Sequence, residues 1–143
     1  MIPILLIIPL ITGVITQATK LIWRAAEGTF SWRSLTFYGG MPSAHTAFAS
    51  SLITVVGLKE GVQSPSFALA TIFGIIIVRD AIGFRRYIGS HSRALNIIVQ
   101  DLPKKTQSRF RGFREQLGHT PLEAFVGAII GIALSSVLYV AFM

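Results

Sequence analysis

Two histidines and a glutamate have the residue types and the spacing for nucleophilic or acid–base chemistry. His119 and Glu123 lie four residues apart in the stretch LGHTPLEAFVG. If a helix begins near Thr120 or Pro121, this i, i+4 spacing lets the carboxylate accept the Nδ1–H of the imidazole and leaves Nε2 to react. An imidazole oriented in this way serves as a nucleophile, a general base or a metal ligand.

The second histidine, His45, stands at the start of another apolar run, in the stretch GGMPSAH. Pro42 and Ser43 form a helix-start signal, so His45 is expected in the first turn of that helix, at the same depth in the fold as His119. A glutamate inside an apolar segment is costly unless it has a partner. Glu123 therefore predicts an enclosed polar site that both histidines line.

The elements that carry these residues are strongly apolar. Of the 143 residues, 52% are hydrophobic and 13% are charged, whereas about a quarter are charged in soluble proteins. Four apolar stretches cover residues 2–19, 44–58, 67–84 and 122–143. Because about 20 apolar residues cross a bilayer, we expect an all-α integral membrane bundle of about four transmembrane helices. The whole chain is expected to form one domain.

The charged residues gather on one side of these predicted spans. Of the 13 Lys and Arg residues, only Lys59 lies outside the loop after the first span, the segment after the third span and their borders. The positive-inside rule makes this face cytoplasmic, with both termini outside. Residues 85–117 mix apolar patches with basic residues and predict a short interfacial helix on anionic lipid, followed by a polar loop. His91 lies in this segment and matches no catalytic motif.

Composition also excludes some classes of function. The chain contains no cysteine, so disulfides, thiolate metal sites and cysteine nucleophiles are ruled out. The net charge of +7 comes from basic residues between apolar runs. This placement is typical of a topology signal and of attraction to membrane lipids, and nucleic acid is not an expected partner.

Three stretches, GGMPSAH, VRDAIGFRR and LGHTPLEAFVG, together resemble motifs of the type 2 phosphatidic acid phosphatase (PAP2) family, and most closely its small divergent branch. The superfamily includes bacterial acid phosphatases and vanadium haloperoxidases. The resemblance extends from Lys20 onward and implies a two-step phosphohydrolase that needs no metal or other cofactor. It implies that His119 forms a phosphohistidine, that Glu123 orients it, and that His45 protonates the leaving group and then activates water.

The sequence departs from the family pattern where the phosphate would be held. Glu27 and Gly28 stand where the family has an Arg-Pro pair after Lys20, and Gly112 and Phe113 replace a Ser-Arg pair. Charge on phosphoryl oxygens must be held by fixed cations and N–H groups, so other residues are expected to supply them. The expected substrate-binding residues are Lys20, Ser43, Arg79, Asp80, Arg85 and Arg86, with Asp80 either pairing with Arg79 or joining the site.

A site at head-group depth predicts a lipid phosphate substrate. Phosphatidic acid, phosphatidylglycerophosphate and a polyprenyl phosphate or diphosphate all fit, and cytoplasmic orientation favours phosphatidylglycerophosphate. Two other hypotheses remain open. One is a metal-dependent membrane hydrolase with His45, His119 and Glu123 as ligands. The other is a non-catalytic protein that binds anionic lipid or a partner. Gly127 and Gly131 predict either close helix packing or a homodimer through the last span.

The predicted orientation can be tested with single cysteines, because the natural chain has none. In intact cells, a membrane-impermeant maleimide should label Ser64→Cys. Lys104→Cys should react only after permeabilisation, since the basic face is predicted to be cytoplasmic. Labelling of Lys104→Cys in intact cells would contradict this orientation.

Overall fold

The computed structural model describes residues 4–26, 28, 40–110 and 112–143, and no strand occurs among them. The helices in chain order are α1 (Ile4–Ala26), α2 (Ala44–Glu60), α3 (Pro65–Arg79), the π-helical turn η2 (Asp80–Phe84), α4 (Arg85–Gln100), α5 (Lys104–Gln107) and α6 (Pro121–Phe142). The expected all-α architecture is confirmed.

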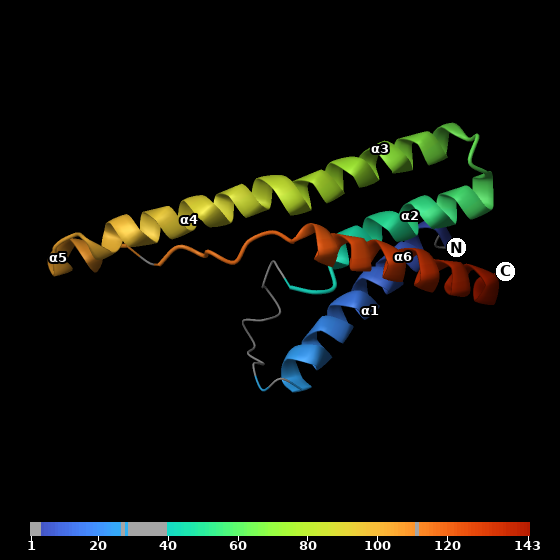
Figure 1. Cartoon of the computed structure of the whole chain (residues 1–143). Coiled ribbons are helices and arrows are strands. Elements are labelled where there is room, and N and C mark those ends of the chain that lie inside the picture. The colour runs from blue at the N-terminus through green and yellow to red at the C-terminus, as the bar shows by residue number, and fades with distance from the viewer. Residues whose placement is uncertain (1–3, 27, 29–39, 111) are drawn as a thin grey trace.

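Helix α2 forms the centre of the bundle and packs against α1, α3 and α6. Figure 1 shows the beginning of α1, the C-terminus and the α2–α3 connection at one end of the bundle. The beginnings of α2 and α6 lie at the opposite end, beside η2. This arrangement brings the helix starts that carry the histidine motifs to the same end of the bundle.

In the part of the chain that the structure describes, three helical segments are long and apolar enough to cross a membrane, namely Ile4–Trp23, Pro65–Gln100 and Pro121–Phe142. The second of these runs continuously through α3, η2 and α4. Helix α2 has 17 residues, which is near the lower limit of about 17–25 for a transmembrane helix. Of the four expected spans, three are thus clearly long enough, while α2 is a shorter central helix.

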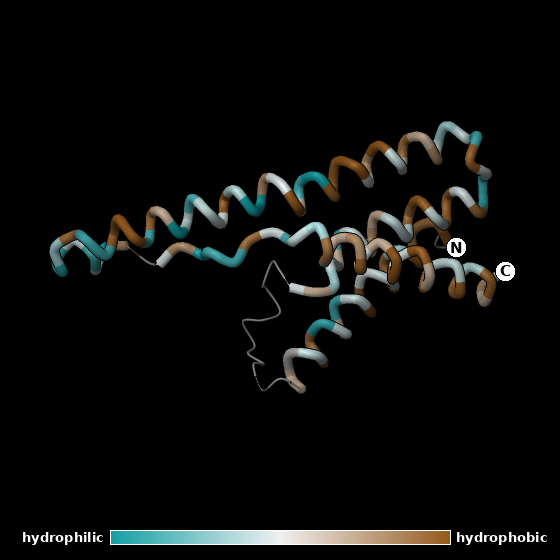
Figure 2. Tube along the Cα trace, viewed as in Figure 1, coloured by the Kyte–Doolittle hydropathy of each residue, from teal (hydrophilic) through white to brown (hydrophobic). Residues whose placement is uncertain are grey.

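The third span differs from the expectation that it would end near Phe84, before a separate interfacial helix. The helix Pro65–Gln100 has 36 residues without a break, a length of about 54 Å at about 1.5 Å per residue. Because a hydrocarbon core is about 30 Å thick, α4 extends beyond it as an arm. Figure 2 shows the change along this helix, from mostly hydrophobic α3 to α4 with alternating hydrophilic and hydrophobic residues.

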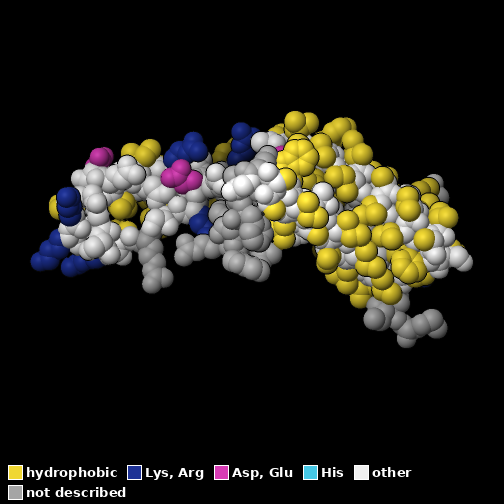
Figure 3. All heavy atoms as spheres, turned by 90° about the horizontal axis from the view of Figure 1, so that it is seen from below, with side chains coloured by type: hydrophobic (Ala, Val, Ile, Leu, Met, Phe, Trp, Pro, Cys, Tyr) yellow, Lys and Arg dark blue, Asp and Glu magenta, His cyan; other side chains and the backbone are white. Residues whose placement is uncertain are grey.

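The segment after α5, expected to be a polar loop, is paired with α4. The Asn96 side chain donates to the Phe113 carbonyl oxygen and accepts from the Phe113 N–H, each at 2.8 Å. Asn96 also donates to Glu115, and Arg93 Nε lies 3.2 Å from the same carboxylate. Figure 3 shows Lys and Arg side chains on this arm and a largely hydrophobic surface over the bundle. The segment after α5 therefore runs back along α4 toward the bundle.

Two glycines allow α6 to approach α2 closely. Both Gly127 and Gly131 are buried. A Cβ atom at Gly127 would overlap the Ser43 carbonyl oxygen, and one at Gly131 would overlap the Ala47 carbonyl oxygen and the Ser50 hydroxyl. These glycines thus serve close helix packing within the chain, the first of the two roles expected for them. A homodimer stays a prediction.

The packing role of Gly131 can be tested by adding one methyl group. Gly131→Ala should lower the free energy of unfolding by about 1–3 kcal/mol, because the α2–α6 contact must open to admit the Cβ. Thermal denaturation of the detergent-solubilised protein measures this loss. Gly83→Ala is the matched control, since nothing lies within 4 Å of a Cβ at Gly83. Equal melting temperatures for the two variants would contradict the packing argument.

Candidate active site

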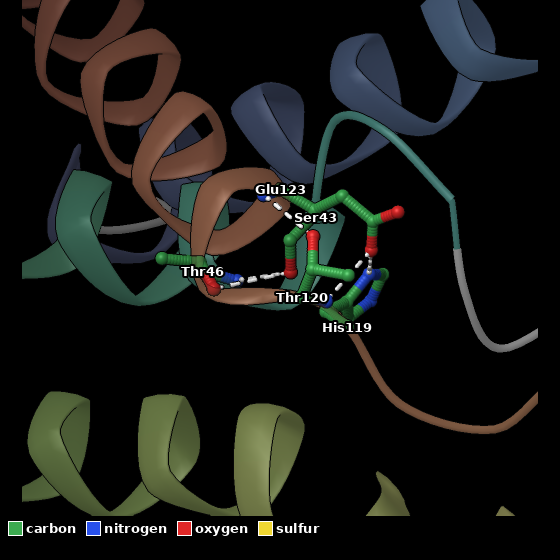
Figure 4. A network of polar contacts seen from close by, with 5 residues as sticks. All are labelled: Ser43, Thr46, His119, Thr120 and Glu123. Carbon is green, nitrogen blue, oxygen red and sulfur yellow. Dashed lines mark hydrogen bonds and ion pairs between the residues drawn. The ribbon is translucent and has the colours of Figure 1, made fainter.

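The start of α6 is closed by a capping box. Thr120 is the N-cap residue, and its hydroxyl accepts from the Glu123 N–H at 3.2 Å. The Thr120 N–H in turn donates to Glu123 Oε2 at 3.0 Å. His119 immediately precedes the cap, and its Nδ1 lies 3.2 Å from the same Oε2 (Figure 4). One carboxylate oxygen therefore caps the helix and orients the imidazole, and the contact with the imidazole is the one that the i, i+4 spacing predicts.

A second contact fixes the backbone of His119. Its N–H donates to the Ala81 carbonyl oxygen at 2.9 Å, and the residue is 4% exposed. Ala81 belongs to η2, and π turns depart from the regular i→i−4 hydrogen-bond pattern of the α-helix. The turn between α3 and α4 thus holds the histidine that precedes the cap of α6. The sequence carries no signal for this contact.

Ser43 caps α2 at the other side of the site. Its hydroxyl accepts from the Thr46 N–H at 3.3 Å and from the Thr46 hydroxyl at 3.1 Å. Its own N–H donates to the Glu123 carbonyl oxygen at 3.1 Å, which ties the two helix starts together. Ser43 was expected to bind substrate, but in this structure it is fully buried and joins helices. A substrate contact by Ser43 stays a prediction.

His45 lies in the first turn of α2, as expected, and faces His119. The ring centroids are 6.2 Å apart, and the ring planes are inclined by 56°. Reacting atoms in a productive complex approach to about 3–3.5 Å. A small group held between the rings would therefore lie within reach of both.

Three charged residues from other elements surround the histidine pair. Lys20 of α1 is 3% exposed. The charges of Arg85, Lys20 and Asp80 all act on His45. Arg85 Nε lies 2.6 Å from Asp80 Oδ2. Asp80 thus forms its ion pair with Arg85. The expected pairing of Asp80 with Arg79 is wrong.

The remaining expected residues are placed differently. Arg79 and Arg86 are exposed, and neither is among the charges that act on His45 or His119. His91 is exposed on α4. Glu27, which replaces the Arg of the family's Arg-Pro pair, lies outside the described residues. Within the described part of the chain, Lys20, Asp80 and Arg85 are therefore the expected binding residues that the fold brings to the histidines.

Comparison with known sequences agrees with this arrangement. The sequence profile of the divergent PAP2 family matches residues 3–134. The chain belongs to this family. It is also similar to "Uncharacterized membrane protein YuiD" of Bacillus subtilis (strain 168), with 37% identity over 123 residues, 78% of each chain. No solved structure matches the chain. The resemblance based on three motifs is confirmed, and the protein is an integral membrane member of the divergent PAP2 family.

Two signals that sequence reasoning missed support the site in this divergent PAP2 protein. The first is the spacing of Thr12, Thr16 and Lys20, which places a polar seam along α1. All three are buried, and Thr12 Oγ1 accepts from the Ser51 hydroxyl at 3.2 Å. The second is the pattern T-x-x-E at Thr120, the usual signature of a capping box. Lys20 therefore lies at the end of a row of buried polar residues on α1 within an otherwise apolar bundle.

The length of the Glu123 side chain also has a structural reason. It occupies the third helical position of α6, where a capping box takes Glu or Gln. From this position the glutamate side chain reaches back to both the Thr120 N–H and the His119 ring. One glutamate side chain therefore orients the imidazole and caps the helix.

The electrostatics keep the imidazole of His119 neutral at physiological pH. Burial lowers the pKa of His119 below its usual value of about 6.5, and the charge of Lys20 lowers it further. Hydrogen bonds with Glu123 and with the Gly40 backbone act in the opposite direction without restoring that value. A neutral imidazole retains a ring nitrogen with a lone pair, which is the form that a nucleophile or a metal ligand requires.

A metal site would require His45, His119 and Glu123 to ligate one ion together. Where the structure describes the chain, no group of three or more His, Asp or Glu side chains is close enough to hold a metal ion. His45, His119 and Glu123 would have to rearrange to ligate one ion together. The arrangement as it stands fits a pair of imidazoles acting on a group between them.

The two influences on His119 can be separated by substitution. Glu123→Gln should move the pKa of His119 further down, because Gln can still cap the helix but removes the negative charge that stabilises the imidazolium. Lys20→Met should move that pKa up, because it removes a nearby positive charge. Titration of the imidazole C–H resonances by NMR in detergent measures both. Shifts in the same direction would contradict this account.

Proposed function

We propose that this protein is a membrane phosphohydrolase that removes phosphate from a lipid head group through a phosphohistidine on His119. The observation that carries this proposal is the buried His119 imidazole, held by Glu123 at 3.2 Å, with the His45 ring 6.2 Å away. Family membership supports phosphatase-like chemistry for these motifs. The site thus contains a nucleophile, a carboxylate that orients it and a second imidazole.

In the first step, the Nε2 lone pair of His119 attacks phosphorus. The P–O bond to the lipid breaks, its electron pair leaves with the lipid oxygen, and His45 transfers a proton to that oxygen. An alkoxide is a poor leaving group, and a positioned acid contributes about 100- to 10,000-fold to such a step. Glu123 stabilises the positive charge that develops on the His119 ring.

In the second step, His45 takes a proton from water, and the oxygen of that water attacks phosphorus. The P–N bond breaks, phosphate leaves, and His119 returns to its neutral form. The sum of the two steps is hydrolysis of the ester to an alcohol and phosphate. His45 alternates between acid and base, and Glu123 stays ionised throughout.

Lys20 and Arg85 are the proposed cations for the phosphoryl oxygens. The charge of Arg85 acts on His45, and the charge of Lys20 acts on both histidines from a buried position where little solvent screens it. Fixed cations of this kind supply most of the catalysis in phosphoryl transfer. Asp80 positions Arg85 through their 2.6 Å contact. Arg79 and Arg86, which are exposed, remain candidates for outer contacts with the head group.

The proposed substrate is a lipid phosphate at the cytoplasmic face. The site lies at the end of the bundle from which the basic arm extends, where anionic lipid would gather (Figure 3). Phosphatidic acid, phosphatidylglycerophosphate and polyprenyl phosphates or diphosphates are the candidates. Cytoplasmic orientation favours phosphatidylglycerophosphate, because that lipid is made on this side of the membrane.

The proposal predicts how the three histidines differ. His119→Ala should abolish phosphate release from these lipids, and His45→Ala should slow it about 100- to 10,000-fold. His91→Ala should leave it unchanged, since His91 is exposed on α4 and has no role in the mechanism. Phosphate release by purified protein in detergent, with and without chelator, is the measurement.

Each other hypothesis has its own outcome in this assay. Loss of activity on chelation, restored by added metal, would favour a metal-dependent hydrolase. No release from any lipid phosphate by well-folded parent protein would favour a non-catalytic lipid-binding protein. Equal loss of activity in the His91 and His119 variants would indicate that folding, rather than chemistry, explains the result.

A further inference from the structure

An apolar groove lies between α2 and α3, beside the candidate active site. Its volume is about 380 Å³, and its walls are almost entirely apolar. Ligand pockets are typically about 300–1,000 Å³. The groove is therefore large enough for part of a ligand, and its walls suit hydrocarbon rather than a polar group.

One end of the groove adjoins the site. Thr46 lines the groove, and its hydroxyl donates to Ser43, the cap of α2. Ile82 lines it as well and belongs to η2, the turn that holds the backbone of His119. Arg79 is an exposed cation on the wall. This end therefore combines contact with the catalytic elements and a positive charge.

The other end lies deeper in the bundle. Ile53 is seven residues beyond Thr46 on α2, which corresponds to about 10 Å along the helix axis. Gly74 of α3 faces it, and a Cβ at Gly74 would lie 2.5 Å from the Ile53 Cδ1 atom. The glycine thus leaves room for Ile53 between the two helices. The groove runs from the level of the histidines into the apolar part of the bundle.

We propose that this groove holds one hydrocarbon chain of the lipid phosphate, with the phosphate at the histidine end and Arg79 at the head-group boundary. The inference rests on the proposed phosphohydrolase function. It makes the groove the part of the site that selects substrates by the length of their hydrocarbon chain. Three features favour this occupant: the lining by Thr46 next to the α2 cap and by Ile82 of η2, the apolar walls, and the cation of Arg79 on the wall.

When the substrate comes from a bilayer, binding of its hydrocarbon chain in the groove mainly positions the phosphate and adds little to the binding free energy. A chain that moves from lipid to an apolar groove gains little hydrophobic free energy, because both surroundings are apolar. A chain that moves from water gains about fourfold in binding per methylene. Soluble phosphate monoesters therefore reveal the groove most clearly.

The test uses butyl, octyl and dodecyl phosphate as monomers below their micelle concentrations. With parent protein in detergent, and with KM expressed as the free ester in water after subtraction of the fraction bound to detergent micelles, KM should fall steeply from butyl to octyl phosphate, by about fourfold per methylene until the groove is filled. Ile75→Trp places a large ring on the groove wall and should raise KM for dodecyl phosphate at least tenfold while leaving butyl phosphate unaffected. Ile53→Ala enlarges the deep end and should move the preferred chain to greater length.

Ile76→Trp is the matched control. Ile76 is 57% exposed and Ile75 is 60% exposed, on the same helix, but only Ile75 lines the groove. Ile76→Trp should retain the chain-length profile of the parent. Equal effects of the two tryptophans, or turnover with a KM that does not depend on chain length, would overturn the groove proposal and leave the phosphohydrolase standing. Failure of folded protein to hydrolyse any ester, butyl phosphate included, would remove both proposals.

Discussion

The close contact between the beginnings of α2 and α6 is the constraint on which the site depends. Gly127 and Gly131 let α6 approach the backbone of α2, and the Ser43 N–H reaches the Glu123 carbonyl oxygen at 3.1 Å. Two helix starts with unsatisfied N–H groups are thereby joined directly in a largely apolar bundle. This contact places His45 and His119 at the same depth, so the distance between the imidazoles follows from helix packing.

Much of this site could be predicted from the sequence because its signals are local. Ser43 before an apolar run identifies a helix start, and the spacing of His119 and Glu123 predicts their contact whatever the rest of the fold does. The apolar stretches predict the bundle in the same way, since each helix satisfies its own backbone hydrogen bonds in lipid. The family resemblance then connected motifs that no local rule relates.

The parts that could not be predicted depend on contacts between distant segments. No local rule indicates that the Ala81 carbonyl oxygen accepts from the His119 N–H, or that Asp80 pairs with Arg85 rather than with its neighbour in sequence. The continuous helix from α3 into α4 was missed because the charged residues near Asp80 resemble the end of a span. The pairing of the returning segment with α4 requires Asn96, a residue that the sequence gives no reason to select.

The double use of Glu123 Oε2 has a consequence for how this protein can evolve. A single atom contributes to the stability of α6 and to the reactivity of His119, so selection on either property acts on both. A shorter acid at this position would have to give up part of the helix cap, and an amide would keep the cap but lose the charge. The identity of the acid is therefore constrained by two independent demands, a length that reaches the Thr120 N–H and a negative charge beside the His119 ring.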